Sequence, residues 1–310
     1  MHFEIKENTI LRTLHGSRAY GTNVETSDYD YKGVAVAPLD TYVGFARNFE
    51  QHETYVSKGH DRDEVIYDIR KFFKLASDCN PNILEILFVD ESDIISITPI
   101  GEKLMEMRDD FISKKAKYTF TGYAISQLKR IKGHRGWLLD PPKKKPERED
   151  YGLPIDTKMS TSERGAYEHV SKTEVLPDHI MRLLTKEKQY AAAKRRWDQY
   201  QSWKKNRNKA RAKDEAEFGF DGKHAYHLVR LLRMGKEILQ GKGVLVKRPD
   251  AEELLEIRSG LWSYDRLISE SEEYIKDIDE LYEKSSLPKT PQVNKLHQKC
   301  AELVLEFHNT

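Results

Sequence analysis

Residues 16–30 read Gly-Ser-Arg-Ala-Tyr-Gly-Thr-Asn-Val-Glu-Thr-Ser-Asp-Tyr-Asp, and this stretch decides the fold that we expect. A short strand is predicted just before it, at residues 9–14, and a second strand is predicted over residues 28–36. The backbone amides of the Gly16-Ser17 turn suit an anion. Because side chains alternate along a strand, Asp28 and Asp30 are expected on one face of the second strand.

Together, the turn and the two carboxylates predict a site for a divalent metal ion and a nucleoside triphosphate (NTP). Mg²⁺, or Mn²⁺ in its place, takes a few carboxylates and completes its coordination shell with phosphate oxygens and water. Gly-Ser or Asp-x-Asp alone occurs in many surface turns, so the prediction depends on the joint pattern, which also includes Gly21 and Ser27. The alternative is a solvated turn whose aspartates only cap backbone amides.

The composition limits the classes of protein to consider. A chain of 310 residues is long enough for two domains, and a net charge of only +1 means that any affinity for nucleic acid must come from local patches. Two cysteines, Cys79 and Cys300, are too few for a disulfide framework or a zinc site. No apolar run has the length of a signal peptide or a membrane span. We therefore expect a cytoplasmic protein with no membrane partner.

The chain changes character near residue 110. Up to that point strand and helix signals alternate, with a β-like run at 63–69 and helices at 70–76 and 83–88, which predicts a small mixed α+β domain over residues 1–110. A mainly helical domain is predicted over residues 111–310. Its expected helices cover residues 116–132, 224–240, 251–257, 264–284 and 291–307, and residues 133–154 are expected to form a loop.

A third carboxylate is expected, because two-metal phosphoryl transfer uses one ion for the attacking hydroxyl and one for the triphosphate. Asp68 is the best candidate, since it lies between Tyr67 and Ile69 in the β-like run and can point away from these apolar neighbours. Asp63 and Glu64 are rivals at the start of the same run. The structural alternative is that Asp68 only pairs with a neighbouring cation.

Cationic side chains are predicted to bind the nucleotide from two directions. Arg18 follows the Gly-Ser turn, and Lys71 begins the helix after the third-carboxylate strand. Lys223, His227 and Arg230 share one helix face at i, i+4 and i+7, opposite a leucine-rich stripe. The alternative is a solvated cationic surface, and for His227 also a core histidine with its hydrogen bonds satisfied.

A basic segment at residues 186–213 carries interleaved aromatic side chains. Such a segment can follow a nucleic-acid backbone while its rings stack on bases, although a long charged helix with an aromatic stripe is often only docked by one face. The predicted nucleic-acid-binding residues are Lys194, Arg195, Arg196, Trp197, Lys204 and Lys205.

The joint pattern of Gly16-Ser17 with Asp28-x-Asp30 resembles the signature of the DNA polymerase beta nucleotidyltransferase superfamily. More narrowly, the chain is similar to predicted nucleotidyltransferases associated with RNA-repair operons and common in bacteriophage genomes. The segments that carry this second resemblance are Ser-Asp-Tyr-Asp-Tyr-Lys-Gly at 27–33, Tyr-Asp-Ile-Arg-Lys-Phe at 67–72, Asn-Pro-Asn-Ile-Leu-Glu at 80–85, Lys-His-Ala-Tyr-His at 223–227 and Ile-Arg-Ser-Gly at 257–260.

The resemblance implies the superfamily fold and transfer of a nucleoside monophosphate (NMP) from an NTP to a hydroxyl. The basic segment and the RNA-repair context favour an RNA 3′ end as the acceptor. Two alternatives stay open: transfer to a protein hydroxyl, as in antitoxin-like members of the superfamily, and a non-enzymatic module that binds nucleotides or nucleic acid.

Overall fold

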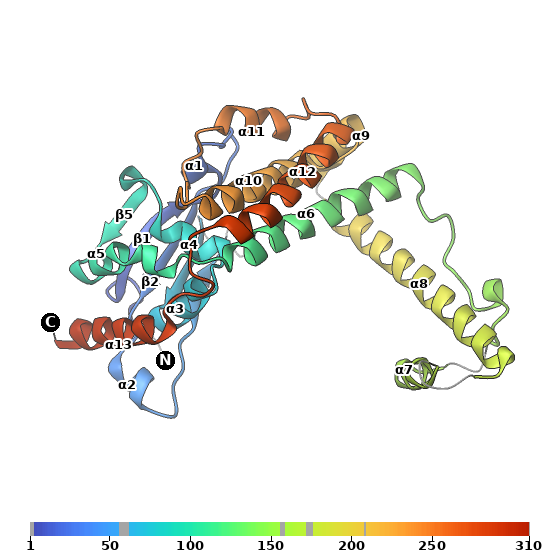
Figure 1. Ribbon diagram of the computed structural model, residues 1–310, viewed down its shortest axis with the longest axis horizontal. Coiled ribbons are helices and arrows are strands. Elements are labelled where there is room, and N and C mark those ends of the chain that lie inside the picture. The colour runs from blue at the N-terminus through green and yellow to red at the C-terminus, as the bar shows by residue number, and fades with distance from the viewer. Residues whose placement is uncertain (1–2, 56–61, 156–158, 172–175, 208, 310) are drawn as a thin grey trace. The chain divides into compact units, whose positions relative to one another are not determined.

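A computed structural model describes residues 3–55, 62–155, 159–171, 176–207 and 209–309 (Figure 1). The chain divides into two compact units. Unit 1 combines Met1–Ile131 with Asp221–Thr310, and unit 2 is Lys132–Phe220. Each unit is described by itself below. The boundary predicted near residue 110, between a mixed α+β domain and a mainly helical domain, stays a prediction.

Unit 1 is built on a mixed sheet. The described residues form five strands in the order β3-β4-β2-β1-β5, and β2 and β4 are parallel whereas the other neighbours are antiparallel. The strands are β1 (Thr9–His15), β2 (Asp30–Ala35), β3 (Gln51–Thr54), β4 (Asp63–Asp68) and β5 (Ile94–Ile97). The predicted α+β fold is therefore confirmed.

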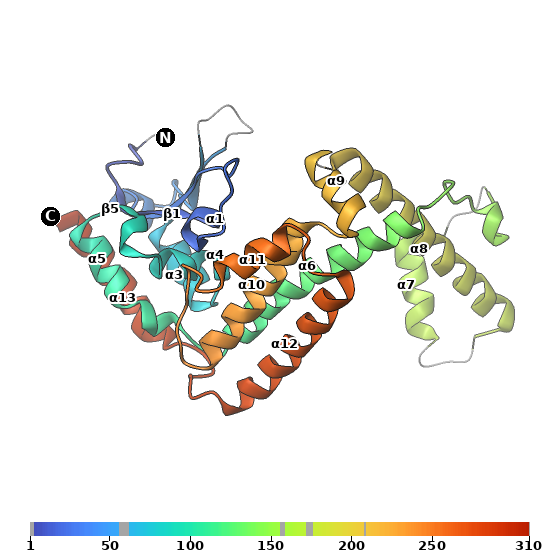
Figure 2. The ribbon, with the colours of Figure 1, turned by 90° about the horizontal axis from the view of Figure 1, so that it is seen from above.

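Both chain segments of unit 1 contribute helices in addition to the sheet (Figures 1 and 2). They are α1 (Gly16–Tyr20), α2 (Leu39–Val43), α3 (Ile69–Ser77), α4 (Pro81–Leu87), α5 (Pro99–Glu106), α10 (Gly222–Leu239), α11 (Ala251–Arg258), α12 (Tyr264–Lys284) and α13 (Val293–Asn309). Helix α6 (Ala116–Leu139) begins in unit 1 and ends in unit 2, which also contains α7 (Thr161–Val170), α8 (Asp178–Asn206) and α9 (Lys209–Phe218).

Local sequence explains where the helices beside the sheet begin. The Asp68 carboxylate accepts a hydrogen bond from the Arg70 amide and so caps α3. Asn80 caps α4 in the same way, and Pro81 fills the first helical position, where no amide hydrogen is needed. Phe72 of α3 and Leu84 of α4 are fully buried. These two helices therefore provide much of the core on one face of the sheet.

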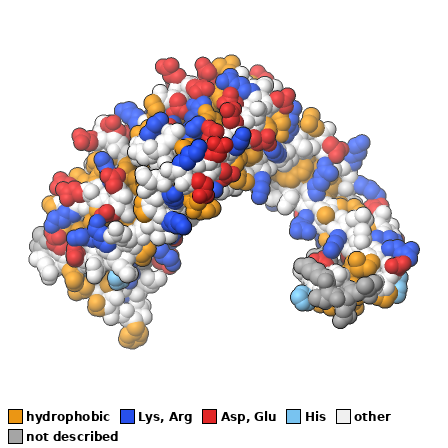
Figure 3. Space-filling model, viewed as in Figure 1, with side chains coloured by type: hydrophobic (Ala, Val, Ile, Leu, Met, Phe, Trp, Pro, Cys, Tyr) orange, Lys and Arg blue, Asp and Glu red, His pale blue; other side chains and the backbone are white. Residues whose placement is uncertain are grey.

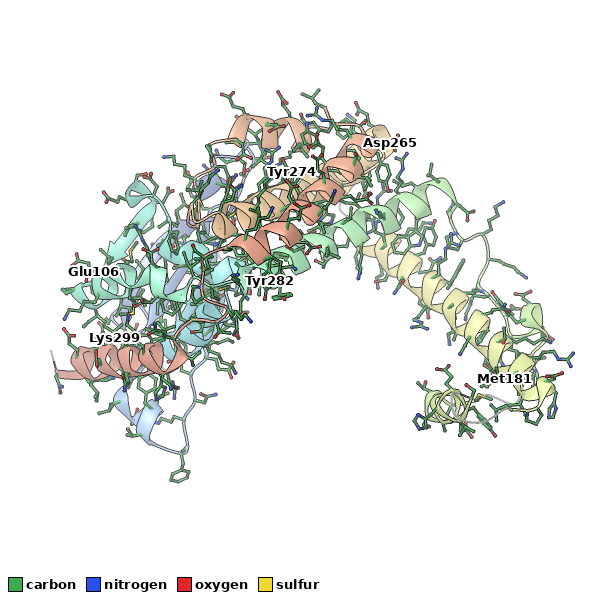
Figure 4. All side chains as sticks on the ribbon, in the orientation of Figure 1. Glu106, Met181, Asp265, Tyr274, Tyr282 and Lys299 are labelled. Carbon is green, nitrogen blue, oxygen red and sulfur yellow. The ribbon has the colours of Figure 1, made fainter. Side chains whose placement is uncertain are left out.

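Helix α10 is the centre of the helical part of unit 1. Its leucine stripe is buried as predicted, and it packs against α11 and α12. At the contact with α12, Arg233 of α10 donates a hydrogen bond to the Tyr274 hydroxyl at 3.1 Å, and Tyr274 is labelled on α12 in Figure 4. Gly235 lies against Phe120 of α6, where an added Cβ would come within 3.3 Å of the ring-bearing side chain. The C-terminal helices thus belong to the compact unit that contains the sheet.

Helix α6 extends beyond its predicted end. The sequence predicts a loop from residue 133, but the helix continues to Leu139. The physical reason is an aromatic cluster in unit 2: the Trp137 ring lies 5.4 Å from Trp203 and 6.2 Å from Tyr200, and His134 stacks beside Trp137 at 5.6 Å. Packing of these rings keeps the last part of α6 helical, although its two glycines lower its helix propensity.

Among the described residues, none of the helices combines the length and the apolar character that crossing a membrane requires.

Candidate active site

A cavity of about 370 Å³ opens in unit 1 where β1 ends and β2 begins. Its lining includes both parts of the predicted signature, the Gly16-Ser17 turn and the two aspartates, together with side chains of α10. The predicted site residues that the structure brings together here are Gly16, Ser17, Asp28, Asp30, Lys223 and His227.

The turn and the second aspartate are in close contact. Gly16 has a φ of +69°, and a Cβ built on it would lie 2.2 Å from an Asp30 carboxylate oxygen. Any side chain at this position would therefore displace the carboxylate as well as strain the backbone. In the register of β1 and β2, His15 pairs with Asp30, which fixes the turn beside the carboxylate.

Arg18 holds the loop that carries Asp28, and it does not line the cavity. Its guanidinium donates to the carbonyl oxygens of Ser27 at 2.8 Å and Asp28 at 3.3 Å, and it lies 3.8 Å from the centre of the Tyr29 ring. The prediction that Arg18 binds the nucleotide stays a prediction. Arg18 positions the first aspartate through the backbone.

The parallel register of β2 and β4 decides which carboxylate accompanies the pair. Asp30 lies opposite Asp63, and Ala35 lies opposite Asp68. Asp63 accordingly lines the cavity, whereas Asp68 sits at the far end of the strand, about 16 Å away at 3.3 Å per residue. Glu64, the other rival, is paired with Arg12 at 2.6 Å.

Asp68 has a structural environment of its own and does not join the site. Its side chain is 1% exposed, accepts a hydrogen bond from the Tyr42 hydroxyl at 2.8 Å and one from the Arg70 amide at 2.9 Å. Of the three candidates for the third carboxylate, Asp63 lines the cavity whereas Asp68 and Glu64 do not, and the role of each stays a prediction.

The donor set fits a divalent cation held jointly with a phosphate. Burial raises the pKa of Asp30, and the negative charge of Asp63 and then that of Asp28 add to the rise, although Lys223 and Lys32 oppose it. No group of three His, Cys, Asp or Glu side chains among the described residues is close enough to hold a metal ion alone. Mg²⁺ needs only one or two carboxylates when phosphate oxygens and water supply the rest.

Lys32 and Arg258 line the cavity and were not predicted from the sequence. Lys32 follows Asp30 at i+2 and so shares its strand face, and its ammonium donates to the Asn82 carbonyl at 3.3 Å. Burial lowers the pKa of Lys32 to about 8 against the opposing charges of Glu85 and Asp30. The i, i+2 spacing was the available signal for Lys32.

Arg258 is brought to the cavity by a close approach of two helices. A Cβ on Gly222 would lie 2.1 Å from the Arg258 carbonyl oxygen, so only glycine lets the start of α10 meet the end of α11. Arg258 also donates to the Thr22 carbonyl at 3.0 Å. Lys223 and Arg258 thus enter the same cavity from neighbouring helix ends.

Arg230, predicted to bind the nucleotide, is instead buried in an ion pair. Its guanidinium donates to Glu85 Oε1, its side chain is 3% exposed, and it lies 3.8 Å from the centre of the Tyr20 ring. Glu85 Oε2 accepts from the Tyr20 hydroxyl at 2.6 Å and lies 3.1 Å from His15 Nε2. Burial alone would raise the pKa of Glu85, but the Arg230 charge holds it below its usual range.

His227 lines the cavity as a neutral side chain. Burial and then the charges of Arg230 and Lys223 lower its pKa well below the usual value. Lys71, by contrast, is on the outside of α3, where its ammonium pairs with Glu50 at 3.0 Å. The structure does not bring Lys71 to the cavity.

The predicted nucleic-acid-binding residues all lie on α8 of unit 2. Figure 3 shows Lys and Arg side chains on the surface of this part of the chain. Their charged members are exposed, and Arg196 pairs with Asp140 at 3.1 Å. Trp197 is half-buried and lines a second cavity, whereas Tyr200 and Trp203 belong to the aromatic cluster with Trp137. The segment predicted as one stretch forms two helices, α8 and α9.

The N-terminal part of the chain is similar to a known protein family. Residues 2–138 match the model of a family described as the RNA repair pathway DNA polymerase beta family, which suggests a nucleotidyltransferase. This match includes β1, β2 and β4 with the cavity-lining aspartates. The resemblance inferred from the sequence is thereby confirmed over these residues.

A similar protein is encoded by a bacteriophage. The chain is 26% identical over 136 residues to an uncharacterized 38.9 kDa protein from the nrdC–mobD intergenic region of Enterobacteria phage T4. The alignment covers 41% of this chain and 40% of the phage protein, so it spans less than half of either. It agrees with the bacteriophage link expected from the sequence.

Proposed function

We propose that this protein is a Mg²⁺-dependent nucleotidyltransferase that transfers an NMP from an NTP to the 3′-hydroxyl of an RNA strand. The observation that carries the proposal is the cavity in unit 1, where the Gly16-Ser17 turn faces Asp28 and Asp30 beside Lys223. A phosphate-binding turn, two carboxylates and a cation in one cavity are the parts that NMP transfer needs.

Each residue has a chemical task in this proposal. The Gly16-Ser17 turn binds the β- and γ-phosphates through its backbone amide and hydroxyl, and Lys32, Lys223 and Arg258 offset the remaining negative charge. Asp28, Asp30 and Asp63 would hold the metal ions. Mg²⁺, when bound, supplies positive charge at the α-phosphate and at the attacking oxygen.

The side chains then orient an in-line displacement. The acceptor oxygen forms a bond to the α-phosphorus, the bond from that phosphorus to the β-phosphate oxygen breaks, and pyrophosphate leaves while the hydroxyl proton is released to water. The neutral His227 does not add charge to the cavity, so Lys32, Lys223 and Arg258 are the cations that meet the leaving group.

An RNA acceptor is favoured by the description of the matching family and by the charge of residues 186–213, which contain eleven Lys and Arg and two Asp and Glu. Transfer to a protein hydroxyl would use the same carboxylates without needing this segment. A module that only binds nucleotides would have no need for two carboxylates beside the turn.

The test is to incubate the protein with each α-³²P-labelled NTP and Mg²⁺, and to supply tRNA, other RNA, single-stranded DNA or cell protein in turn. We expect an RNase-sensitive labelled band that is absent with Asp30→Asn. The matched control is Asp40→Asn, because Asp40 is an exposed aspartate outside the cavity. A protease-sensitive band, or full activity of a folded Asp30→Asn variant, contradicts the proposal.

A further inference from the structure

A second cavity, of about 490 Å³, lies in unit 2 between the start of the loop after α6 and the middle of α8. Its volume is in the range of about 300–1,000 Å³ typical of small-molecule sites. Trp197, Arg196 and Ala193 of α8 line it together with Pro141, Pro142 and Pro146 of the loop. Prolines restrict the backbone, so the loop side of the cavity is largely preformed.

Trp197 differs from the other aromatic side chains of α8 in what it contacts. Tyr200 and Trp203 lie 5.8 Å apart and pack against Trp137, so their rings are occupied by one another. Trp197 makes no ring contact with any aromatic residue in the described part of the chain. Its indole is therefore the ring of this helix that a flat ligand can reach.

The charges around this cavity favour a polyanion. Its two carboxylates are offset, Asp140 by Arg196 at 3.1 Å and Asp150 by Lys144 at 2.6 Å. Lys143, which also lines the cavity, forms no ion pair with any residue that the structure describes. Lys194, one helical turn before Trp197 on α8, is exposed. Cations beside a reachable indole suit a ligand with phosphates and a flat ring.

We propose that the Trp197 cavity is a base-binding subsite for single-stranded nucleic acid, in which one base stacks on the indole and the adjacent phosphates contact Lys143 and Lys194. That the bound strand is the acceptor rests on the proposed function. Binding of the strand itself needs only unit 2, without a metal ion or an NTP. A nucleic-acid strand is favoured over an acidic peptide because an acidic peptide has no flat ring for the indole to stack on.

The experiment measures binding of the full-length protein to three fluorescent probes, with EDTA present and NTP absent. The probes are a 12-nucleotide oligouridylate, an abasic oligonucleotide with the same number of phosphates, and polyglutamate. Stacking on an aromatic side chain predicts that wild type prefers oligouridylate over the abasic probe by about tenfold. We expect Trp197→Ala to lose that preference by weakening oligouridylate binding alone, and Trp197→Phe to keep most of it.

Two results would overturn the subsite. One is equal binding of oligouridylate by wild type and Trp197→Ala; the other is wild-type binding of the abasic probe or polyglutamate as tight as that of oligouridylate. Trp197→Phe retains a ring, so it also shows whether a loss in Trp197→Ala reflects stacking or unfolding. If wild type prefers oligouridylate as expected but labels no acceptor with any NTP, the proposed function fails while the subsite stands.

Discussion

Replacing Arg230 by methionine tests whether this side chain builds the fold or binds the nucleotide. The substitution keeps an unbranched apolar stem but leaves the buried Glu85 carboxylate without its guanidinium partner. Removing one partner of a buried ion pair costs about 3–5 kcal/mol, because the remaining charge stays desolvated. We therefore expect Arg230→Met to lower the free energy of unfolding by about 3 kcal/mol.

The surroundings of Glu85 predict how this loss varies with pH. Arg230 is one of the charges that lower the pKa of His15, although burial is the larger cause and Lys32 also contributes. Without Arg230, protonated His15 can pair with Glu85, since Nε2 lies 3.1 Å from the carboxylate. The destabilisation of Arg230→Met should therefore be smaller at pH 5.5 than at pH 8.

The assay is urea unfolding followed by circular dichroism, for wild type, Arg230→Met, Glu85→Gln and the double variant. A buried pair predicts that the double variant loses clearly less than the sum of the two single losses. The reasoning is refuted if Arg230→Met loses less than about 1 kcal/mol, which is the range of an exposed ion pair. An increase in the KM for NTP at unchanged stability would restore the nucleotide-binding role predicted from the sequence.

Three further predictions concern the third carboxylate, the buried histidine and the aromatic cluster. Asp63→Asn should lower kcat by at least about 100-fold at unchanged thermal stability. Asp68→Asn should lower the unfolding free energy by about 1–3 kcal/mol and leave kcat unchanged. A loss of kcat in Asp68→Asn but not in Asp63→Asn would contradict the argument from the β2–β4 register. The pKa of His15 in the fold is lowered to about 4 from 6.5 by burial, so stability is lost as the pH falls below 6.5, by about 2 kcal/mol between pH 7 and pH 4.5. His15→Gln should remove about 2 kcal/mol of that loss in urea unfolding, while the buried His227 keeps its own contribution and replacement of the exposed His52 by Gln changes nothing; an undiminished slope in His15→Gln would count against this assignment. Trp203→Ala should lower the free energy of unfolding by about 2–3 kcal/mol through loss of the aromatic cluster. Equal stability of this variant and wild type in thermal unfolding would show that the cluster does not hold α6 and α8 together.

The sequence predicted elements that local patterns determine. Alternating side chains identified β1, β2 and β4, and helical spacing identified α3, α10 and α12, whose observed bounds Tyr264–Lys284 agree with the prediction. The cavity-lining Gly16-Ser17 turn and the two aspartates were also found this way, because their spacing lies within fifteen residues. Each of these features depends on neighbours in the chain.

Features that depend on distant residues were predicted less well. Asp63 and Asp68 lie on one strand, and the β2–β4 register that separates them cannot be read from either strand alone. Lys223, His227 and Arg230 do share a helix face, but Glu85, 145 residues away from Arg230 in sequence, buries the last of them. The end of α6 was missed because Tyr200 and Trp203, which pack against Trp137, lie more than sixty residues further on.

The Arg230–Glu85 pair also bears on how the site works. It joins α10, which supplies Lys223 and His227, to α4 beside the sheet, and Glu85 in turn contacts Tyr20 and His15 next to the Gly16 turn. Moving α10 away from the sheet would leave both charges buried and unpaired or would expose them with loss of the surrounding packing. The cationic and acidic walls of the cavity are therefore held together by this pair and its contacts. A motion of α10 away from the sheet is therefore disfavoured by several kcal/mol.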